Sequence, residues 1–95
     1  MNEVMQNLFV AHLLKAFADN YPCLKTLHGH SYNISELAAA LNVDQGNMSR
    51  SVGRMVEFGL VLVNSQIQPR GRPTMIVQTS PLAIKLLTAL QEVVE

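Results

Sequence analysis

The side chains with the clearest chemistry in this 95-residue sequence are its four arginines, which all lie between residues 45 and 74. Arg50, Arg54, Arg70 and Arg72 share that window with one acid, Glu57, so the window carries a net charge of +3. Three lysines against six acids give the remainder −3, and the formal total is zero. Because the local field decides which face of a protein meets a polyanion, a total of zero does not exclude nucleic acid as a partner. The distribution of charge indicates a basic surface suited to a polyanion.

A second group with possible chemistry consists of His12, Cys23, His28 and His30. Cysteine and histidine are suitable zinc ligands, so metal sensing is one interpretation. The spacing Cys23-x4-His28-x-His30 fits no standard closed zinc site, however, and His12 must come from a different element. We therefore expect a buried thiol and polar loop histidines, with no metal and no cofactor.

Several classes of protein are disfavoured by what the sequence lacks. It has no glycine-rich phosphate loop, paired-carboxylate signature or Ser/His/Asp arrangement, so we expect no enzyme. The N-terminus carries an acid where a secretory signal needs a base, and no stretch approaches the roughly 20 apolar residues of a membrane span. A single cysteine fits the reducing cytoplasm. With 48% hydrophobic residues, we expect one cytoplasmic domain over residues 1–95.

Helical spacing of apolar residues predicts the elements that must position the arginines. The first helix is expected over residues 3–18. Residues 23–33 are less regular and form a loop or a short extra helical turn. A short helix follows over residues 35–41, with Ser35 as its N-cap.

A tight turn then leads into a third helix over residues 44–58. Asn42 can take the left-handed conformation that ends a helix, Val43 fills the turn from beneath, and Asp44 is the new N-cap. Gly59 stands at the C-terminal stop, where glycine is favoured. The inward positions of this helix are expected to be Met48, Val52, Met55 and Val56.

The hydrophobic period then changes from helical to alternating. Residues 60–63 and 75–78 are typical of strands, and the turn-forming, basic residues 68–73 between them predict a β-hairpin with a long tip. Ser80 then caps a last helix, with Pro81 in its first position, over residues 81–94.

This order, α-α-α-β-wing-β-α, resembles the winged helix-turn-helix transcriptional regulators, particularly the MarR-like and ArsR-like groups. The resemblance covers residues 34–90 and includes Ser35-Glu36-Leu37-Ala38, Met48-Ser49-Arg50, Phe58-Gly59-Leu60-Val61 and Gln78-Thr79-Ser80-Pro81. It implies a mainly α fold with a small β-hairpin (α+β). It also implies double-stranded DNA as the partner.

The resemblance implies that the helix over residues 44–58 enters the major groove of DNA. Glutamine and asparagine can pair with adenine through two hydrogen bonds, arginine with guanine, and serine with base edges or phosphates. A glycine lets the backbone approach DNA closely. The alternative is the solvated face of an ordinary helix. The expected DNA-contacting residues are Gln45, Gly46, Asn47, Ser49, Arg50, Ser51 and Arg54.

The hairpin tip carries the segment Arg70-Gly71-Arg72-Pro73, which resembles the core of an AT-hook. The minor groove of an A-tract is narrow and strongly negative, and it attracts arginine. We expect these four residues to contact a minor groove or phosphates. The alternative is a solvated tip that its prolines make rigid.

The terminal helices, over residues 3–18 and 81–94, account for the excess of apolar residues. The last helix is apolar over more than half its circumference and needs partners on two sides. We expect one side to pack on the core and the other to form a two-fold homodimer, although the two helices could instead bury each other within one chain. The expected interface residues are Leu8, Phe9, Leu86, Leu87, Leu90 and Val94.

The sequence thus predicts a homodimeric, sequence-specific transcriptional regulator, a repressor that occupies a short pseudo-palindromic operator. Two other functions stay open. One is a DNA-binding protein of plasmid or phage replication or partition. The other is a winged-helix protein-interaction module without nucleic acid, since one fold serves many functions. Four arginines on the two expected DNA elements argue against the last.

Overall fold

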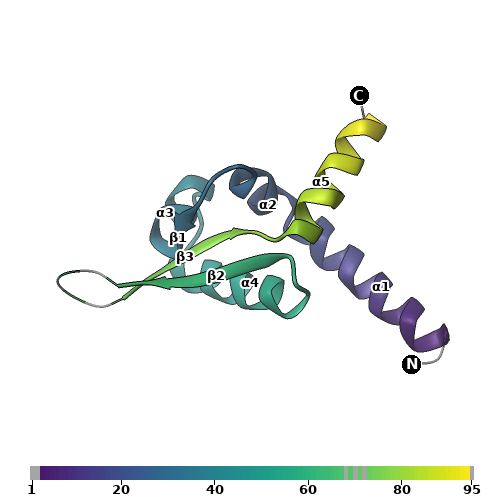
Figure 1. The fold of residues 1–95 in the computed structure, drawn as a ribbon, viewed down its shortest axis with the longest axis horizontal. Coiled ribbons are helices and arrows are strands. Elements are labelled where there is room, and N and C mark those ends of the chain that lie inside the picture. Colours follow the sequence, from purple (N-terminus) through teal and green to yellow (C-terminus); the bar gives the residue numbers. More distant parts are fainter. Residues whose placement is uncertain (1–2, 68, 70, 72, 95) are drawn as a thin grey trace.

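A helix-turn-helix pair lies beside a small sheet in the computed structural model, which describes residues 3–67, 69, 71 and 73–94, the side chain of Val94 excepted. Figure 1 shows the elements in chain order. They are α1 (Glu3–Asp19), α2 (Tyr21–Leu27), β1 (Tyr32–Asn33), α3 (Ile34–Leu41), α4 (Gln45–Glu57), β2 (Val61–Gln66), β3 (Thr74–Thr79) and α5 (Pro81–Val94). The expected fold, mainly helical with a β-hairpin, is confirmed.

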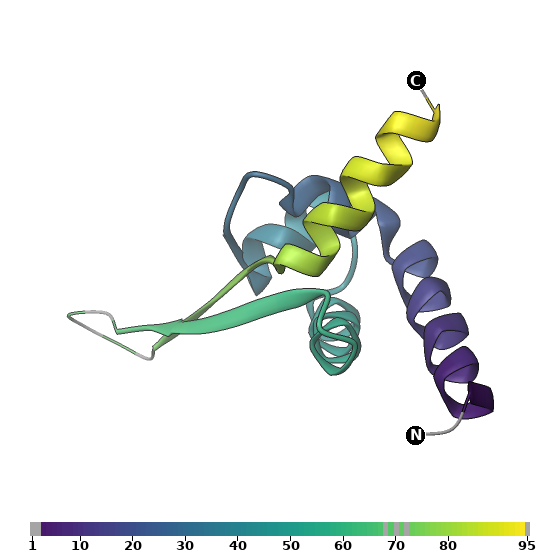
Figure 2. The same cartoon turned by 45° about the vertical axis from the view of Figure 1, so that its right-hand side comes forward.

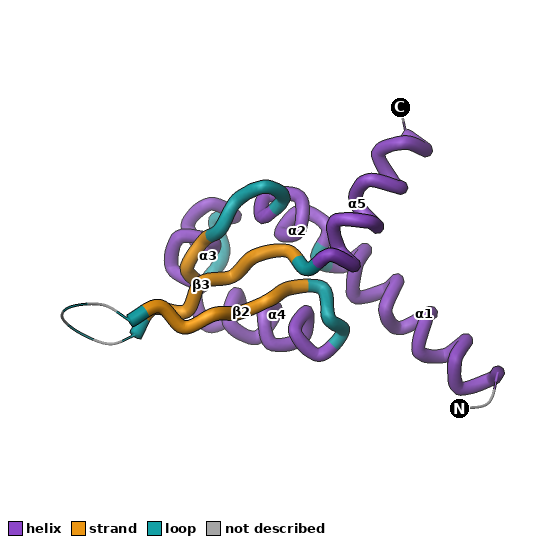
Figure 3. Tube along the Cα trace, viewed as in Figure 1, coloured by secondary structure: helices purple, strands orange, loops and turns teal. Residues whose placement is uncertain are grey.

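The sheet has one strand more than the sequence predicts. Its order is β1-β3-β2, with both pairings antiparallel, and Figure 3 shows the strands side by side. Val77 is the central residue: it lies opposite Val63 in β2 and Tyr32 in β1. The expectation of a loop or one helical turn over residues 23–33 is incomplete, because this segment holds most of α2 and the whole of β1.

Short polar side chains fix both ends of α3 and the start of α4. Asn33, not Ser35 as predicted, caps α3: its Oδ1 accepts from the Glu36 backbone N–H (2.7 Å), while the Asn33 N–H donates to Glu36 Oε1 (3.0 Å). Asn42 ends the helix in the left-handed conformation (φ 55°), as predicted. Asp44 caps α4 by accepting from the Asn47 backbone N–H at 3.1 Å, which is also confirmed.

The end of α4 is tied to the start of α5 through one buried serine. Gly59 stops α4 with φ 70°, in the conformation that glycine adopts without strain. The Ser80 hydroxyl donates to the Gly59 carbonyl (2.6 Å) and accepts from the Ala83 backbone N–H (3.2 Å). The Ser80 backbone N–H donates to the Leu60 carbonyl (3.0 Å). Ser80 therefore caps α5, as predicted, and clamps it to the segment that leaves α4.

The core sits where α2, α3 and α4 pack with the sheet and the first turns of α5. Leu24, Leu27, Leu37, Met55, Leu60 and Val77 are its largest fully buried side chains. Three of the four predicted inward residues of α4 are buried, but Val56 is 46% exposed, so that prediction is wrong. Val43 is also exposed, at 45%, and does not fill the turn from beneath.

The two terminal helices project from the end of the molecule opposite the hairpin tip (Figures 1 and 2). The C-terminal part of α1 packs against α2 and α4, and α5 packs against α2 and β3. The helices diverge, so the alternative in which they bury each other is wrong. The radius of gyration is 14.6 Å, whereas roughly 12 Å is usual for a compact chain of this length.

Candidate nucleic-acid interface

Helix α4 presents a mainly polar face to solvent, because three of its four large apolar residues lie on the opposite side. Met48, Val52 and Met55 are buried in the core, so residues a half-turn away must face outward. Of the residues expected to contact DNA, Gln45, Gly46, Asn47, Ser49, Arg50 and Arg54 are exposed, and Ser51 is half-buried. The structure thus brings the predicted α4 residues together on one accessible helix.

Hydrogen bonds link several of these side chains to one another. The Arg50 guanidinium donates to Asn47 Oδ1, one turn earlier on the same helix. The Ser35 hydroxyl of α3 donates to Gln45 Oε1 at 3.2 Å. The structure thus pairs Arg50 with Asn47 and Gln45 with Ser35, which the sequence alone did not predict.

Two residues on this face were missed by the sequence analysis. Gly53 and Glu57 are exposed and, with Arg50 and Arg54, line an open groove of about 730 Å³ between α4 and the end of α1. The helical period could have found them, because residues 46, 50, 53 and 57 follow one stripe at steps of three and four. The stripe therefore contains one arginine, Arg50, and an acid, Glu57, at its C-terminal end.

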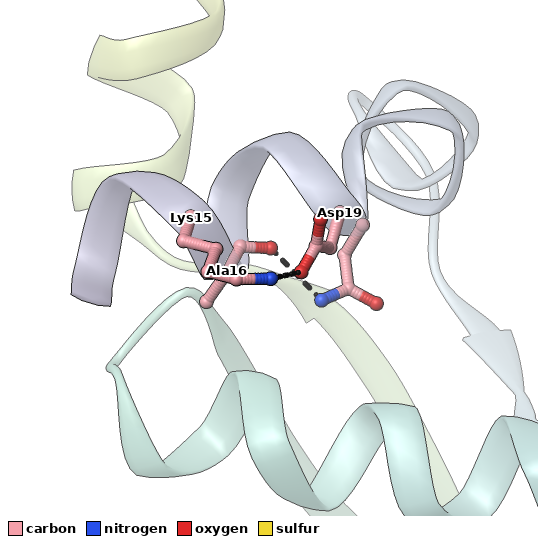
Figure 4. A network of polar contacts seen from close by, with 4 residues as sticks. Lys15, Ala16 and Asp19 are labelled. Atoms are coloured by element: carbon pink, nitrogen blue, oxygen red, sulfur yellow. Dashed lines mark hydrogen bonds and ion pairs between the residues drawn. The ribbon is translucent and has the colours of Figure 1, made fainter. Parts of the chain in front are cut away.

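The far wall of that groove is the last turn of α1, which contributes a second acid. Asp19 lines the groove, and its carboxylate pairs with the Lys15 ammonium at 3.0 Å. Figure 4 shows this pair, with α4 running below it. The Asn20 side chain donates to the Ala16 carbonyl (2.8 Å) and holds the junction of α1 and α2. Lys15 partly neutralises an acid that would otherwise oppose a polyanion beside Arg50 and Arg54.

The hairpin borders the same surface from the other side. A groove of about 360 Å³ is lined by residues from the start of α3, the first residue of α4 and the start of β3: Asn33, Ile34, Ser35, Gln45, Thr74 and Met75. In the wing, Gly71 (φ 90°) and Pro73 are exposed, and Ile67 is 87% exposed. The predicted wing residues Arg70 and Arg72 lie outside the described residues. The start of α4 and the base of the wing are therefore neighbours.

The residues considered for a metal site are spread over different surroundings. Cys23 is buried in the core, where desolvation raises the pKa of its thiol to about 11. The rings of His30 and Tyr32 are in contact, with centroids 6.2 Å apart, and His28 is exposed. Across the described residues, no group of three or more His, Cys, Asp or Glu side chains is placed to hold a metal ion.

The residues expected at a dimer interface divide into two groups. Leu8 is 53% exposed and Phe9 is 49% exposed on the projecting part of α1, where the Phe9 ring lies 6.1 Å from that of Phe58. Leu87, in contrast to the prediction, is buried in the core of its own chain. Leu86 and Leu90 are half-buried against that core, and the side chain of Val94 lies outside the described residues. Among the described residues of α5, the large apolar side chains that are exposed are instead Leu82, Ile84 and Val93.

Comparison with known proteins finds the same fold in several solved structures. No protein-family model matches the sequence, and no curated protein matches it. Among solved structures, a transcriptional regulator HlyU from Vibrio vulnificus is 23% identical with a TM-score of 0.71, covering 96% of this chain and 94% of its own. The transcriptional repressor BigR from Xylella fastidiosa is 23% identical with a TM-score of 0.72, covering 98% and 96%.

A third structure is described as a homodimeric winged helix-turn-helix DNA-binding domain from Mycobacterium bovis, a possible ArsR-family transcriptional regulator. It is 20% identical, with a TM-score of 0.74, and the match covers 99% of this chain and 86% of that one. In the described part of the present chain, no helix is both long and apolar enough to cross a membrane. The resemblance inferred from the sequence is thus confirmed at the level of fold: this chain is a winged helix-turn-helix protein.

Proposed function

We propose that this protein is a sequence-specific double-stranded DNA-binding transcriptional regulator that acts in the cytoplasm as a homodimer. The observation that carries the proposal is the exposed polar face of α4. Its buried side fixes it on the core through Met48, Val52 and Met55, while Arg50 and Arg54 are exposed on the groove between α4 and the end of α1. In helix-turn-helix proteins the second helix of the pair enters the major groove, and phosphate contacts fix its register.

The dimer is supported by surface that the chain leaves uncovered. Its accessible surface is 6712 Å², whereas roughly 5,400 Å² is expected for a compact monomer of this mass. The excess, roughly 1,300 Å² by the same relation, is larger than the ~800 Å² that each partner contributes to an interface of standard size. Exposed apolar residues on both projecting helices, Leu8 and Phe9 on α1 with Ile84 and Val93 on α5, indicate where a second copy would pack.

Two of the similar structures support a regulatory role. HlyU is described as a transcriptional regulator, and BigR, described as a transcriptional repressor, supports repression in particular. A role in plasmid or phage replication or partition would use the same DNA-binding surface. A protein-interaction module would not need Arg50 and Arg54 on the exposed face of α4. The arrangement of charge therefore favours DNA over a protein partner.

Selection of bound sequences from random duplex DNA, followed by footprinting on the winning duplex, tests the proposal. We expect one enriched motif with two-fold symmetry and protection on both half-sites. Arg50→Ala should weaken binding to that motif by about 1–3 kcal/mol, whereas Lys85→Ala, which removes one charge from α5, should leave the base preference unchanged. Failure to enrich any duplex would exclude DNA as the partner and leave the protein-interaction module.

A further inference from the structure

The hydrogen bonds within the α4 surface assign different tasks to side chains that look equivalent in the sequence. Asn47 and Arg50 both face solvent, and both are of types that read base edges. In the structure, however, the Arg50 guanidinium donates to Asn47 Oδ1. The pair is three residues apart, so it lies on adjacent turns of one helix face.

This contact uses the atom that Asn47 would need to recognise adenine. An asparagine pairs with adenine by accepting from N6–H through its Oδ1 while donating to N7 through its Nδ2. Because Oδ1 already accepts from Arg50, the N6–H of an adenine would have to share this oxygen with the guanidinium through its second lone pair. The side-chain oxygen of Gln45 is likewise already hydrogen-bonded, because its Oε1 accepts from the Ser35 hydroxyl.

The Arg50 guanidinium, by contrast, presents donors only. The carboxylate of Asp44 accepts from the Asn47 backbone N–H. Glu57 lies two turns beyond Arg50, at the C-terminal end of the helix, while the N-terminal residues of a recognition helix make the base contacts. The donors of a guanidinium match guanine, which presents two acceptors, N7 and O6, in the major groove, and do not match the amino groups of adenine or cytosine.

We propose that Asn47 is a positioning residue that holds the Arg50 guanidinium for a guanine, and that it does not read adenine itself. This inference rests on the proposed function and narrows it to operators with a guanine opposite Arg50 in each half-site. An arginine that is held before binding loses less side-chain freedom when it meets the base. The structure thereby gives Arg50 and Asn47 one shared base position instead of two.

The test is a double-mutant cycle on the full-length protein with two duplexes. One carries the operator from the random selection, and the other has the G·C pair at the Arg50 position replaced by A·T. Arg50→Ala should remove the preference between them. Asn47→Ala should reduce that preference about two- to tenfold, the loss expected for one unordered long side chain. In the Arg50→Ala background, Asn47→Ala should change it by less than about twofold, because the two residues act as one unit.

Asn47→Asp provides the matched control. It keeps an oxygen in place of Oδ1, so the preference for guanine should persist, while its negative charge lowers affinity for both duplexes equally. None of these changes removes the cap of α4, which uses the Asn47 backbone N–H and the Asp44 carboxylate. Equal melting temperatures will show that the fold is intact.

Two results would overturn the assignment while leaving DNA binding established. One is a relaxed preference at a separate adenine position in Asn47→Ala, additive with the effect of Arg50→Ala. The other is an operator in which no guanine position depends on Arg50. If the wild-type protein enriches no duplex at all, the proposed function fails, and this inference fails with it.

Discussion

Shortening Leu8 on the projecting part of α1 should weaken the proposed dimer without unfolding the protein. Leu8 is 53% exposed in the single chain, so about half of its surface is left for a partner to cover. Full burial of a leucine side chain contributes about 1.5–3 kcal/mol, and the uncovered half is therefore worth about 1 kcal/mol. A two-fold interface contains the residue twice, so Leu8→Ala should weaken the dimer by about 2 kcal/mol, or roughly 30-fold in Kd.

The dissociation constant can be measured by sedimentation equilibrium of the wild-type and variant proteins over a range of concentrations. Val43→Ala is the matched control, because Val43 is an exposed apolar residue on the turn between α3 and α4, outside the projecting parts of both terminal helices. It should change the dissociation constant by less than twofold. A wild-type protein that stays monomeric at tens of micromolar, or an unchanged constant in Leu8→Ala, would refute the reasoning from exposed surface.

Three further perturbations address the charge, the turn and the thiol. Lys15→Met should weaken DNA binding at low salt, because it frees the Asp19 carboxylate beside α4; Lys85→Met, the matched control on α5, should have less effect in the same titration. Asn42→Ala should lower the unfolding free energy by about 1 kcal/mol in urea, because alanine tolerates the left-handed conformation poorly, whereas Asn42→Gly should not. Burial raises the pKa of Cys23 from 9.0 to about 11, so the folded protein keeps a proton that the unfolded chain loses between these values. The unfolding free energy should therefore fall by about 1.4 kcal/mol per pH unit over that interval, and Cys23→Ala should abolish this slope; an equal slope in both proteins would contradict it.

The sequence predicted most successfully the features that depend on a few adjacent residues. The cap at Asp44, the left-handed stop at Asn42 and the cap at Ser80 each follow from one side chain and its own backbone. The division of α4 into buried and exposed faces followed from the helical period. These local signals were enough to identify the winged helix-turn-helix fold.

The features that failed depend on contacts between distant residues. Strand β1 is only two residues long, and it exists because Tyr32 and Asn33 pair with Val77 and Ile76, more than 40 positions away. Directly after this strand, α3 begins at Ile34, earlier in the chain than predicted, and Asn33, rather than Ser35, is its cap. Leu87 was assigned to a partner because its helix is apolar over more than half its circumference, and periodicity cannot say which apolar side meets the core. The hydrogen bond between Asn47 and Arg50 likewise could not be predicted from the sequence, because it depends on how two exposed side chains are oriented.

The clamp at Ser80 bears on the spacing of the DNA sites that a dimer can occupy. Its hydroxyl joins the Gly59 carbonyl, just after α4, to the first turn of α5, so the start of the projecting helix is held at a buried point. The 14 residues of α5 extend about 21 Å, and a tilt of roughly 10° at Ser80 would move the far end by about 4 Å over that length. Successive major grooves on one side of the duplex recur every 34–36 Å or so. In the proposed dimer, the hydrogen bonds of Ser80 therefore restrict the half-site separation that the two subunits can bind. Removing these bonds would widen the range of separations that are bound, without altering any residue that touches a base.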